Sequence, residues 1–248
     1  MTIMKKYPSV KEMSGSQQVQ WVKDIFSTVT GKYDFLNHLL SLRRDIAWRR
    51  RCVEKMRFPM TRRLLDVATG TGDLAIEAVR RHPGIEAVGL DFVREMLEVG
   101  RRKAEMKGYG RCIRLLEADA LQMPFRDNAF DVVAVAFGIR NIPEKIHALK
   151  EMRRVVVPGG QVLVLEFTLP KTPFFKPLYR VYLNALLPFL ARFFSPNPGA
   201  YTYLADSVMN FPGPEAFKVL MKEAGLVRLS AYPLTLGVTW LYLGHKPG

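Results

Sequence analysis

The feature of the sequence that most constrains the fold is a regular alternation of short apolar runs with amphipathic stretches over residues 63–168. The runs RLLDVA, EAVGLD, RCIRLLEAD, FDVVAVAF and QVLVLEFT have the length and apolar content of buried strands. Patterns with helical spacing stand between most of them, over residues 72–82, 93–108 and 143–156. Because parallel strands need crossover helices, this alternation predicts an α/β fold with a doubly wound parallel sheet.

Further helices are expected on either side of this region. Apolar residues recur at helical spacing over 19–29, and a second helical stretch runs over 33–51, so two helices should precede the first strand. Residues 170–212 contain seven prolines among aromatic and basic residues, and we interpret them as an inserted cap of short helices. Residues 214–225 predict a helix, and the runs 226–234 and 239–246 predict a closing hairpin.

The chain is strongly basic. It has 37 Lys and Arg against 23 Asp and Glu, a formal net charge of +14, which favours contact with an anionic surface. Nucleic acid and an acidic membrane face both fit, and so does a protein whose charge only improves solubility. The longest charge-free run of the most apolar region lies between Arg180 and Arg192, well short of the ~20 residues of a spanning helix. Any membrane contact is therefore expected to be peripheral.

Two further observations bear on the compartment. Cys52 and Cys112 lie far apart with no cluster of Cys or His around either, so neither a metal site nor a disulfide framework is indicated. The first twenty residues lack the apolar core of a secretory signal. Both features favour a cytoplasmic location, with peripheral contact at the inner face of the cell membrane where the protein meets lipid.

The segment DVATGTGDLA at 66–75 leads from the first predicted strand into a helix through small residues. Gly70 and Gly72 allow backbone N–H groups to approach a ligand closely. Asp91 closes the second predicted strand 19 positions after Gly72, where a doubly wound fold places the carboxylate that binds ribose hydroxyls. The turn therefore predicts a ligand that contains adenosine.

The pattern GTGDLA also matches the G-x-G-x-x-A fingerprint of dinucleotide-binding enzymes. The charged residues around the turn indicate whether the ligand is a dinucleotide or another adenosine-containing molecule. Asp66 precedes the first glycine by four residues and would repel a pyrophosphate. It suits a cationic ligand such as S-adenosylmethionine, whose amino-acid end would lie between Asp66 and Asp73. Asp119 follows the third strand and is placed for an adenine amino group, while Ala120 leaves room for the ring. The alternative is that these carboxylates only cap helices.

Several longer segments are similar to the ubiquinone/menaquinone biosynthesis C-methyltransferase family, within the class I S-adenosylmethionine-dependent methyltransferases. They are KYDFLNHLLS at 32–41, LLDVATGTGDLA at 64–75, ADALQMPFRDNAFD at 118–131, AFGIRNI at 136–142, RRVVVPGGQVLVLEFTLP at 153–170 and YTYLADSVMNFP at 201–212. These segments span nearly the whole chain after residue 20, and AFGIRN and LEFTLP are far more specific than the glycine turn.

The resemblance implies a Rossmann-like, mostly parallel seven-stranded sheet and methyl transfer to a ring carbon of a polyprenylated quinol, with demethylmenaquinol as the first candidate. A 2-polyprenyl-6-methoxy-1,4-benzoquinol of ubiquinone synthesis, or another lipid quinol, is the alternative. The family's cofactor residues fall on Thr71, Asp91, Asp119 and Ala120. We expect one domain over 1–248, made of an N-terminal helical cap (17–60), a cofactor-binding core (61–169), an inserted substrate cap (170–212) and a closing helix and hairpin (213–248).

The chain departs from the family pattern at a few positions. Ala136 stands where many members have Ser before Phe-Gly, which removes one hydrogen bond near the cofactor. In the first signature, Leu36 replaces a Met, and Asp45 replaces a His before Trp. The loss of that His bears on the choice of quinol ring rather than on the methyl donor.

Catalysis on a quinol ring requires both positioning and deprotonation of a neighbouring hydroxyl. Arg140 and Asn141 follow the fourth predicted strand, and Arg140 is the first candidate to stabilise the developing quinolate. A structural ion pair is the alternative for Arg140. Asn141, Tyr33 and His38 are the other catalytic candidates. Tyr33 lies on a helix face that is expected to close over the ring, and His38 has the intrinsic pKa of a general base near neutral pH. Glu166 ends the fifth strand and either orients the substrate or serves the structure.

The inserted cap mixes aromatic with basic side chains, which suits a long prenyl tail and an anionic lipid surface. Ordinary core packing of the aromatic residues is the alternative. The residues concerned are Phe174, Phe175, Tyr179, Tyr182, Phe189, Phe193 and Phe194.

Three other classes of function stay open. An RNA or DNA methyltransferase fits the net charge, but AFGIRNI occupies the place of the polar-Pro-Pro-aromatic loop of base methylation, so no nucleic acid partner is expected. An NAD(P)-dependent oxidoreductase is disfavoured by Asp66 and Asp119. A noncatalytic protein that binds the cofactor or a membrane is the third class. A homodimer is compatible with the sequence and not specified by it.

Overall fold

The centre of the computed structural model, which describes residues 13–30, 33–170, 172–173, 175–187, 189, 197 and 199–248, is a seven-stranded sheet in the order β3-β2-β1-β4-β5-β7-β6. The strands are β1 Arg63–Val67, β2 Glu86–Asp91, β3 Ile113–Glu117, β4 Phe130–Ala136, β5 Val156–Phe167, β6 Val227–Leu234 and β7 Thr239–His245. Strands β1 to β5 pair in parallel, whereas β7 pairs antiparallel with β5 and β6. The predicted mostly parallel sheet and closing hairpin are confirmed.

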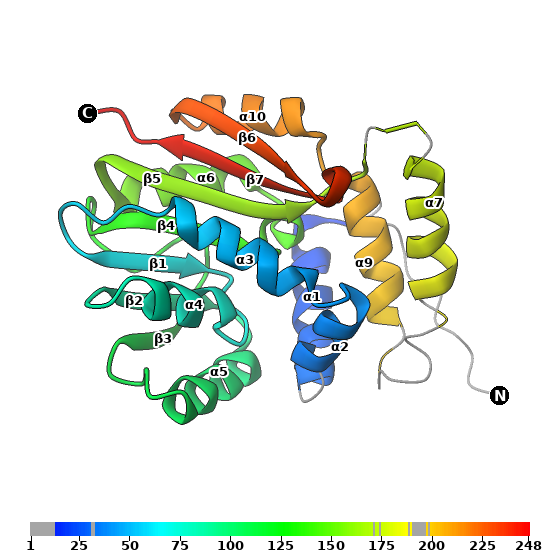
Figure 1. Ribbon diagram of the computed structural model, residues 1–248, viewed down its shortest axis with the longest axis horizontal. Helices are drawn as coiled ribbons and strands as arrows, with labels where there is room; N and C mark the ends of the chain where they lie inside the picture. Colours follow the sequence, from blue (N-terminus) through cyan, green and yellow to red (C-terminus); the bar gives the residue numbers. More distant parts are fainter. Residues whose placement is uncertain are drawn as a thin grey trace.

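Helices cover both faces of this sheet (Figure 1). They include α3 Arg44–Lys55, α4 Asp73–Arg81, α5 Arg94–Met106, α6 Lys145–Val155 and α10 Pro214–Glu223. Neighbouring residues of β1 point to opposite faces: Leu64 packs in one core with Trp48 and Ala78, and Leu65 packs in the other with Leu149 and Phe217. Burial on both faces explains why the strands are apolar at nearly every position.

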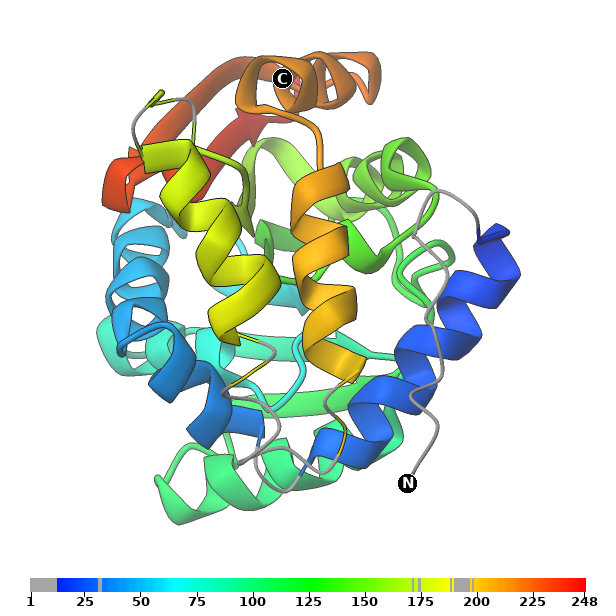
Figure 2. The same cartoon turned by 90° about the vertical axis from the view of Figure 1, so that its right-hand side faces the viewer.

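A layer of helices lies beyond the carboxyl ends of the parallel strands (Figure 2). It contains α1 Gly15–Val29, α2 Tyr33–Leu40, α7 Phe175–Val181, the π-helical turn η3 Tyr182–Leu186 and α9 Gly199–Asn210. In Figure 1, β1 and β5 point toward this layer. The helical character expected of the inserted cap is confirmed for its described residues, while the division into one domain with four segments stays a prediction.

The expectation of two helices before the first strand is wrong, because the second stretch is divided into α2 and α3. Leu42 and Arg43 have φ angles of 51° and 60°, two consecutive residues in the left-handed region that an α-helix cannot contain. The Arg43 N–H donates to the carbonyl of His38 at 2.7 Å and closes the end of α2. This break sets α2 and α3 at different angles beside the glycine turn.

The sequence Pro158-Gly159-Gly160 predicts a turn between the helix over 143–156 and the strand that follows it, but these residues form an irregularity inside β5. The register with β4 shifts from the pair Phe130 and Val156 to the pair Val132 and Gln161. Gly159 takes a φ of 74° there. The extra residues are absorbed as a bulge, so β5 is twelve residues long and begins before the predicted turn.

Some sequence predictions fall outside the described residues. These are the side chains of Tyr33, Phe174, Phe175, Phe193 and Phe194. Among the residues that the structure does describe, no helix combines the length and the apolar character needed to cross a bilayer.

Candidate active site

The turn between β1 and α4 uses backbone angles that small residues adopt most easily. Ala68, Gly70 and Gly72 have φ angles of 51°, 56° and 79°. Left-handed angles are free for glycine and cost a residue with a β-carbon about 1 kcal/mol. The angles fold the turn tightly over the end of β1, and Gly72 is the N-cap of α4.

Asp91, at the end of β2, fixes this turn from the neighbouring strand. Its Oδ2 accepts a hydrogen bond from the Gly70 N–H at 2.8 Å, and its Oδ1 accepts one from the Val93 N–H at 3.0 Å. The Thr69 N–H donates to the Leu90 carbonyl at 3.0 Å. Burial raises the pKa of Asp91, because the backbone donors offset only part of its desolvation. The second strand therefore holds both its own carboxylate and the glycine turn in place.

Asp66 lies beneath the turn and is only 1% exposed. Its Oδ2 accepts hydrogen bonds from the Thr69 hydroxyl at 2.6 Å and from the Ala75 N–H at 3.2 Å. Burial outweighs these bonds and the charge of Arg49, and raises the pKa of Asp66 to about 7. The Asp66 carboxyl group therefore ionises near neutral pH. A nearby cation would shift this equilibrium toward the anionic form.

The turn, Asp66 and Asp91 border a cavity of about 180 Å³, here called the turn cavity. It is lined by seven of the eight residues predicted to bind the cofactor: Asp66, Gly70, Thr71, Asp91, Asp119, Ala120 and Ala136. The eighth, Gly72, is not among the lining residues. Asp119 is exposed at the cavity, where its Oδ1 accepts a hydrogen bond from the Leu121 N–H at 2.8 Å. The structure thus brings these predicted residues together.

A second cavity of about 490 Å³, the cap cavity, lies under the cap helices. Most of its walls are aromatic or aliphatic, including Trp48, Phe167, Leu183 and Tyr203. Tyr182 also lines it and ties η3 to α2, since its hydroxyl donates to the Leu40 carbonyl at 2.6 Å. A cavity of this character suits a long hydrocarbon with a small polar head.

Arg140 lines the cap cavity from the 3-10 turn η2 Ile139–Asn141 and is nearly buried. Its Nη1 donates to Glu166 Oε1 at 2.8 Å and to the carbonyl of Phe137, while its backbone N–H donates to Glu166 Oε2 at 3.1 Å. Glu166 is fully buried at the end of β5. The Arg140 Nε has no hydrogen-bond partner among the described residues. The ion pair therefore fixes Arg140 and leaves one buried donor unused.

Asn141 follows Arg140 but lines the turn cavity instead. Its Oδ1 accepts a hydrogen bond from the Tyr203 hydroxyl at 3.2 Å. Gln18 supports the same group from α1, because its Nε2 donates to the Asn141 carbonyl at 3.3 Å and lies 3.5 Å from the Tyr203 hydroxyl. Two consecutive residues of η2 thus face two different cavities.

Phe26, Arg49 and Phe137 line both cavities and form the wall between them. Phe137 has a φ of 61°, a strained angle for a residue with a bulky side chain. Its ring stacks on Phe167 at a centroid distance of 4.5 Å, and the Arg49 guanidinium carbon lies 5.4 Å from its centroid. Strain of this kind persists only where the surroundings hold it, which is typical of functional sites.

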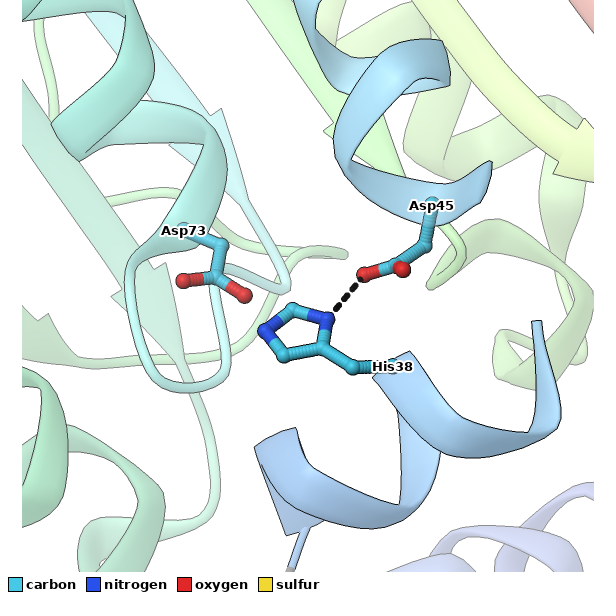
Figure 3. A group of neighbouring side chains, drawn as sticks. All are labelled: His38, Asp45 and Asp73. Carbon is cyan, nitrogen blue, oxygen red and sulfur yellow. Dashed lines mark hydrogen bonds and ion pairs between the residues drawn. The ribbon is translucent and has the colours of Figure 1, made fainter. Parts of the chain in front are cut away.

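His38 belongs to a polar cluster with Asp45 and Asp73 (Figure 3). Its imidazole lies between the carboxylates of Asp45 and Asp73, and its Nδ1 is 2.8 Å from Asp45 Oδ2. The Ser41 hydroxyl donates to Asp45 Oδ1 at 2.7 Å, and Arg49 Nη1 donates to Asp45 Oδ2 at 2.5 Å. Against the opposing effect of burial, these partners lower the pKa of Asp45. His38 itself is not among the residues that line either cavity.

Lys103 of α5 connects the glycine turn to α2. Its Nζ lies 2.5 Å from Asp34 Oδ2, 2.6 Å from Asp73 Oδ1 and 3.0 Å from the Thr71 hydroxyl. The Thr71 hydroxyl also donates to Asp34 Oδ1 at 2.6 Å. Although burial opposes it, the charges of Arg49 and Lys103 lower the pKa of Asp73. The N-terminal helices are thus fastened to the turn by charge-assisted hydrogen bonds.

His38, Asp45 and Asp73 each place a ligand atom of the kind that metals bind within 4.8 Å of the others. Both carboxylates already have cationic partners. Arg49 Nη1 lies 2.5 Å from Asp45 and 3.8 Å from Asp73, and Lys103 bonds the other oxygen of Asp73. A metal ion would have to compete with these side-chain cations, so we interpret the cluster as an ion-pair network.

The strand order, with the antiparallel β7 between β5 and β6, and the glycine turn beside Asp91 define a class I methyltransferase. A model of the ubiE/COQ5 methyltransferase family matches residues 11–246. The chain belongs to this family. The demethylmenaquinone methyltransferase of Thermus thermophilus is 49% identical over 90% of this chain and 100% of that protein. The ubiquinone/menaquinone biosynthesis C-methyltransferase of Geotalea daltonii is 42% identical over 91% of this chain and 96% of that protein.

Solved structures are similar in fold at lower identity. A SAM-dependent methyltransferase of Thermotoga maritima has a TM-score of 0.60 at 19% identity, covering 90% of this chain and 98% of that chain. The phosphoethanolamine N-methyltransferase 2 of Haemonchus contortus, solved in complex with S-adenosyl-L-methionine, has a TM-score of 0.59 at 16% identity and covers 83% of this chain and 52% of that chain. At these identities the similarity shows the fold alone.

Sequence reasoning missed several residues of the site. No local pattern assigns a role to Arg49, Asp34, Lys103 or Phe137. The KYD segment of the first signature was the available signal for Asp34. Nothing in the local sequence singled out Lys103, because its partners come from other helices and from the turn.

Proposed function

We propose that the protein transfers the methyl group of S-adenosylmethionine to a ring carbon of a polyprenylated quinol and converts demethylmenaquinol to menaquinol. Family membership and the name of the Thermus relative support the reaction class. The observation that carries the proposal is the pair of adjoining cavities that share a wall of three residues. A cavity lined by four aspartates beside one with mostly aromatic and aliphatic walls suits a nucleoside cofactor next to a lipid acceptor.

The turn cavity fits a sulfonium cofactor through the chemistry of its lining. Asp91 is a buried carboxylate at the end of β2, where ribose hydroxyls are bound in sheets of this kind. Asp66 is an almost fully buried carboxylate whose pKa of about 7 suits a cationic partner. Asp119 and Ala120 border the same cavity and would bind the adenine. When bound, the cofactor supplies an electrophilic methyl group.

The protein's own contribution to the chemistry centres on Arg140. In our proposal its unused Nε and its charge stabilise the oxygen of the ring as that hydroxyl loses its proton. Glu166 holds the guanidinium in place, and Tyr203 holds Asn141 beside the methyl donor. Tyr33 stays a catalytic candidate from the sequence, as a residue that would close over the ring. His38 lines neither cavity, so we propose that it acts on the position of Arg49 through Asp45.

The test is the transfer of labelled methyl to a demethylmenaquinol analogue by the wild-type protein and by Arg140→Lys. We expect methylated menaquinol from the wild type and a loss of at least about tenfold in turnover from the variant, because lysine lacks the fixed fork of donors. Binding of S-adenosylhomocysteine should stay unchanged in the variant. No product from the wild type would contradict the reaction, and full turnover by the variant would contradict the role of Arg140.

The choice of ring is tested in the same assay. A 2-polyprenyl-6-methoxy-1,4-benzoquinol analogue is offered beside the demethylmenaquinol analogue, and the proposal requires a higher kcat/KM for the latter. Preference for the benzoquinol would transfer the assignment to the ubiquinone pathway, which the name of the Geotalea relative includes.

We also propose that the mouth of the cap cavity lies on an anionic membrane. Leu42 and Leu236 line this cavity and are nevertheless 82% and 70% exposed. Leu178 and Val181 of α7 are more than 60% exposed as well. Exposed apolar side chains on a protein of net charge +14 suit contact with acidic lipid, from which a prenylated substrate would enter.

Liposome flotation tests this contact with Leu42→Glu and Leu236→Glu. Binding of the wild type should require anionic lipid and fall at least about fivefold in the double variant, since each carboxylate opposes both burial and the lipid charge. Val219→Glu is the matched control, because Val219 is 53% exposed on α10 away from the cavity lining. Flotation of all proteins alike, or of none, would contradict the proposed surface.

A further inference from the structure

The turn cavity is unbalanced in charge. Four aspartates line it: Asp66, Asp73, Asp91 and Asp119. Among the described residues that line it, Arg49 is the one basic side chain. The methionyl end of a sulfonium cofactor carries a carboxylate as well as an ammonium group, and a carboxylate in such an acidic cavity needs a cation beside it.

Arg49 is held at the wall between the cavities. It projects from α3, its side chain is 11% exposed, and its guanidinium packs near the ring of Phe137. Asp45, itself 3% exposed and fixed by Ser41 and His38, holds the Nη1 of Arg49. A guanidinium whose Nη1 is held by an aspartate is preorganised, so less conformational freedom is lost when it binds a further carboxylate.

The neighbours of Arg49 match a zwitterion. Its Nη1 is 3.8 Å from Asp73 Oδ2, and Arg49 lines the same cavity as Asp66. Asp66 therefore offers a carboxylate for an ammonium group close to a guanidinium that suits a carboxylate. Neither the nucleoside residues nor the quinol chemistry accounts for an arginine at this position.

We propose that Arg49 binds the carboxylate of the methionyl end of the cofactor. Arg49 is thereby a cofactor-binding residue of the turn cavity, and Asp45 and His38 are the residues that position it. The inference rests on the proposed use of a sulfonium cofactor and extends it to a group on that cofactor. It also explains why the N-terminal helices pack on the turn, since α3 completes the site.

Calorimetric titration with three ligands tests the inference without turnover. S-adenosylhomocysteine has both charged groups, its methyl ester lacks the carboxylate charge, and 5′-methylthioadenosine lacks the whole amino-acid end. For the wild type we expect the ester to bind about tenfold to a hundredfold more weakly than the acid, the size of a lost charge-assisted hydrogen bond. Equal binding of acid and ester would overturn the proposal.

Arg49→Gln supplies the second comparison, because glutamine retains a donor for Asp45. The variant should lose about tenfold or more in affinity for S-adenosylhomocysteine, bind acid and ester alike, and bind 5′-methylthioadenosine within about twofold of the wild type. Arg50→Gln is the matched control, since Arg50 is 55% exposed and pairs with Glu77 at 3.6 Å. Equal losses for all three ligands would mean that Arg49 only shapes the cavity, and would overturn the inference.

The design separates this inference from the function on which it rests. If the wild type binds none of the three ligands, the sulfonium cofactor itself is wrong. If it binds all three with equal affinity, the result supports the assigned cofactor and contradicts the proposed role of Arg49. Should Arg49→Gln fail to fold, the wild-type comparison of acid and ester still decides, because it needs no substitution.

Discussion

Glu166 binds Arg140 at two points, with Oε1 accepting from the guanidinium Nη1 at 2.8 Å and Oε2 accepting from the backbone N–H at 3.1 Å. Because Glu166 is fully buried and Arg140 nearly so, neither charge has water to replace its partner. The pair joins the end of β5 to the turn after β4, directly beside the cap cavity. It is the connection that fixes the direction of the catalytic candidate.

The first prediction concerns this pair. Glu166→Gln leaves the buried guanidinium without a counter-charge, and we expect a decrease of about 3 kcal/mol in the free energy of unfolding, measured by urea denaturation. Asp127→Asn is the control, since Asp127 is 65% exposed in its pair with Arg154 and should cost less than about 1 kcal/mol. Equal effects of the two substitutions would show that Glu166 does not hold a buried charge.

The second prediction concerns the pH dependence of cofactor binding. The pKa of Asp66 is raised by burial to about 7, so the carboxyl is neutral below that pH and anionic above it. A cationic ligand prefers the anion. The affinity for S-adenosylhomocysteine, whose ammonium remains charged, should therefore increase from pH 6 to pH 8, and Asp66→Asn should bind weakly with no dependence on pH in that range. A pH-independent wild type would contradict this assignment.

The same shift affects the stability of the ligand-free protein. A folded pKa above the ordinary value of 3.8 means that the folded state binds more protons between pH 3.8 and about 7. The contribution of Asp66 to stability is thus largest below pH 3.8 and is lost as the pH rises to about 7. The difference in melting temperature between Asp66→Asn and the wild type should grow in favour of the variant over this range and then level off.

The third prediction concerns Lys103, which bonds Asp34, Asp73 and Thr71. Lys103→Met leaves two carboxylates close together without their common cation, and α2 loses its connection to the turn. We expect a loss of about 1–3 kcal/mol in stability and faster hydrogen exchange in α2. Lys107→Met, an exposed lysine at the end of α5, is the control. Unchanged exchange in α2 would show that the helix is held by apolar packing alone.

The fourth prediction concerns the close approach of Gly138 to the glycine turn. A β-carbon at Gly138 would lie 2.6 Å from the β-carbon of Ala68 and 3.2 Å from Val135 Cγ2. Gly138→Ala must therefore push the turn away from β4, and we expect about 1–3 kcal/mol of destabilisation with weaker binding of S-adenosylhomocysteine. Gly213→Ala meets nothing within 4 Å and should have little effect on binding. Wild-type affinity in Gly138→Ala would contradict the tight contact.

Much of the architecture followed from local patterns. The alternation of buried strands and helices predicted the sheet, because residues buried on both faces of a strand are apolar wherever the strand lies in the chain. The glycine turn and the carboxylates after β1, β2 and β3 predicted the turn cavity, because parallel strands end at one edge. Seven of the eight residues assigned to the cofactor line that cavity.

The break between α2 and α3 was not predictable from helical periodicity. Leu42 and Arg43 carry no glycine or proline signal, and their left-handed angles follow from how the two helices pack. The irregularity in β5 is of the same kind, since the glycines at 159 and 160 indicated a turn and the sheet made it a bulge. In both cases tertiary contacts outweighed local preference.

The sequence by itself determined the layered fold, the glycine turn and the family, because each depends on residue types at short spacing. Tertiary structure alone decided that Arg49, Asp73 and Lys103 meet, that Arg140 pairs with Glu166, and that two cavities share one wall. These pairs join elements far apart in the chain. Which charged residues pair, and how strongly, depends on the folded arrangement that brings them together and buries them. The local sequence around each residue does not specify its partner.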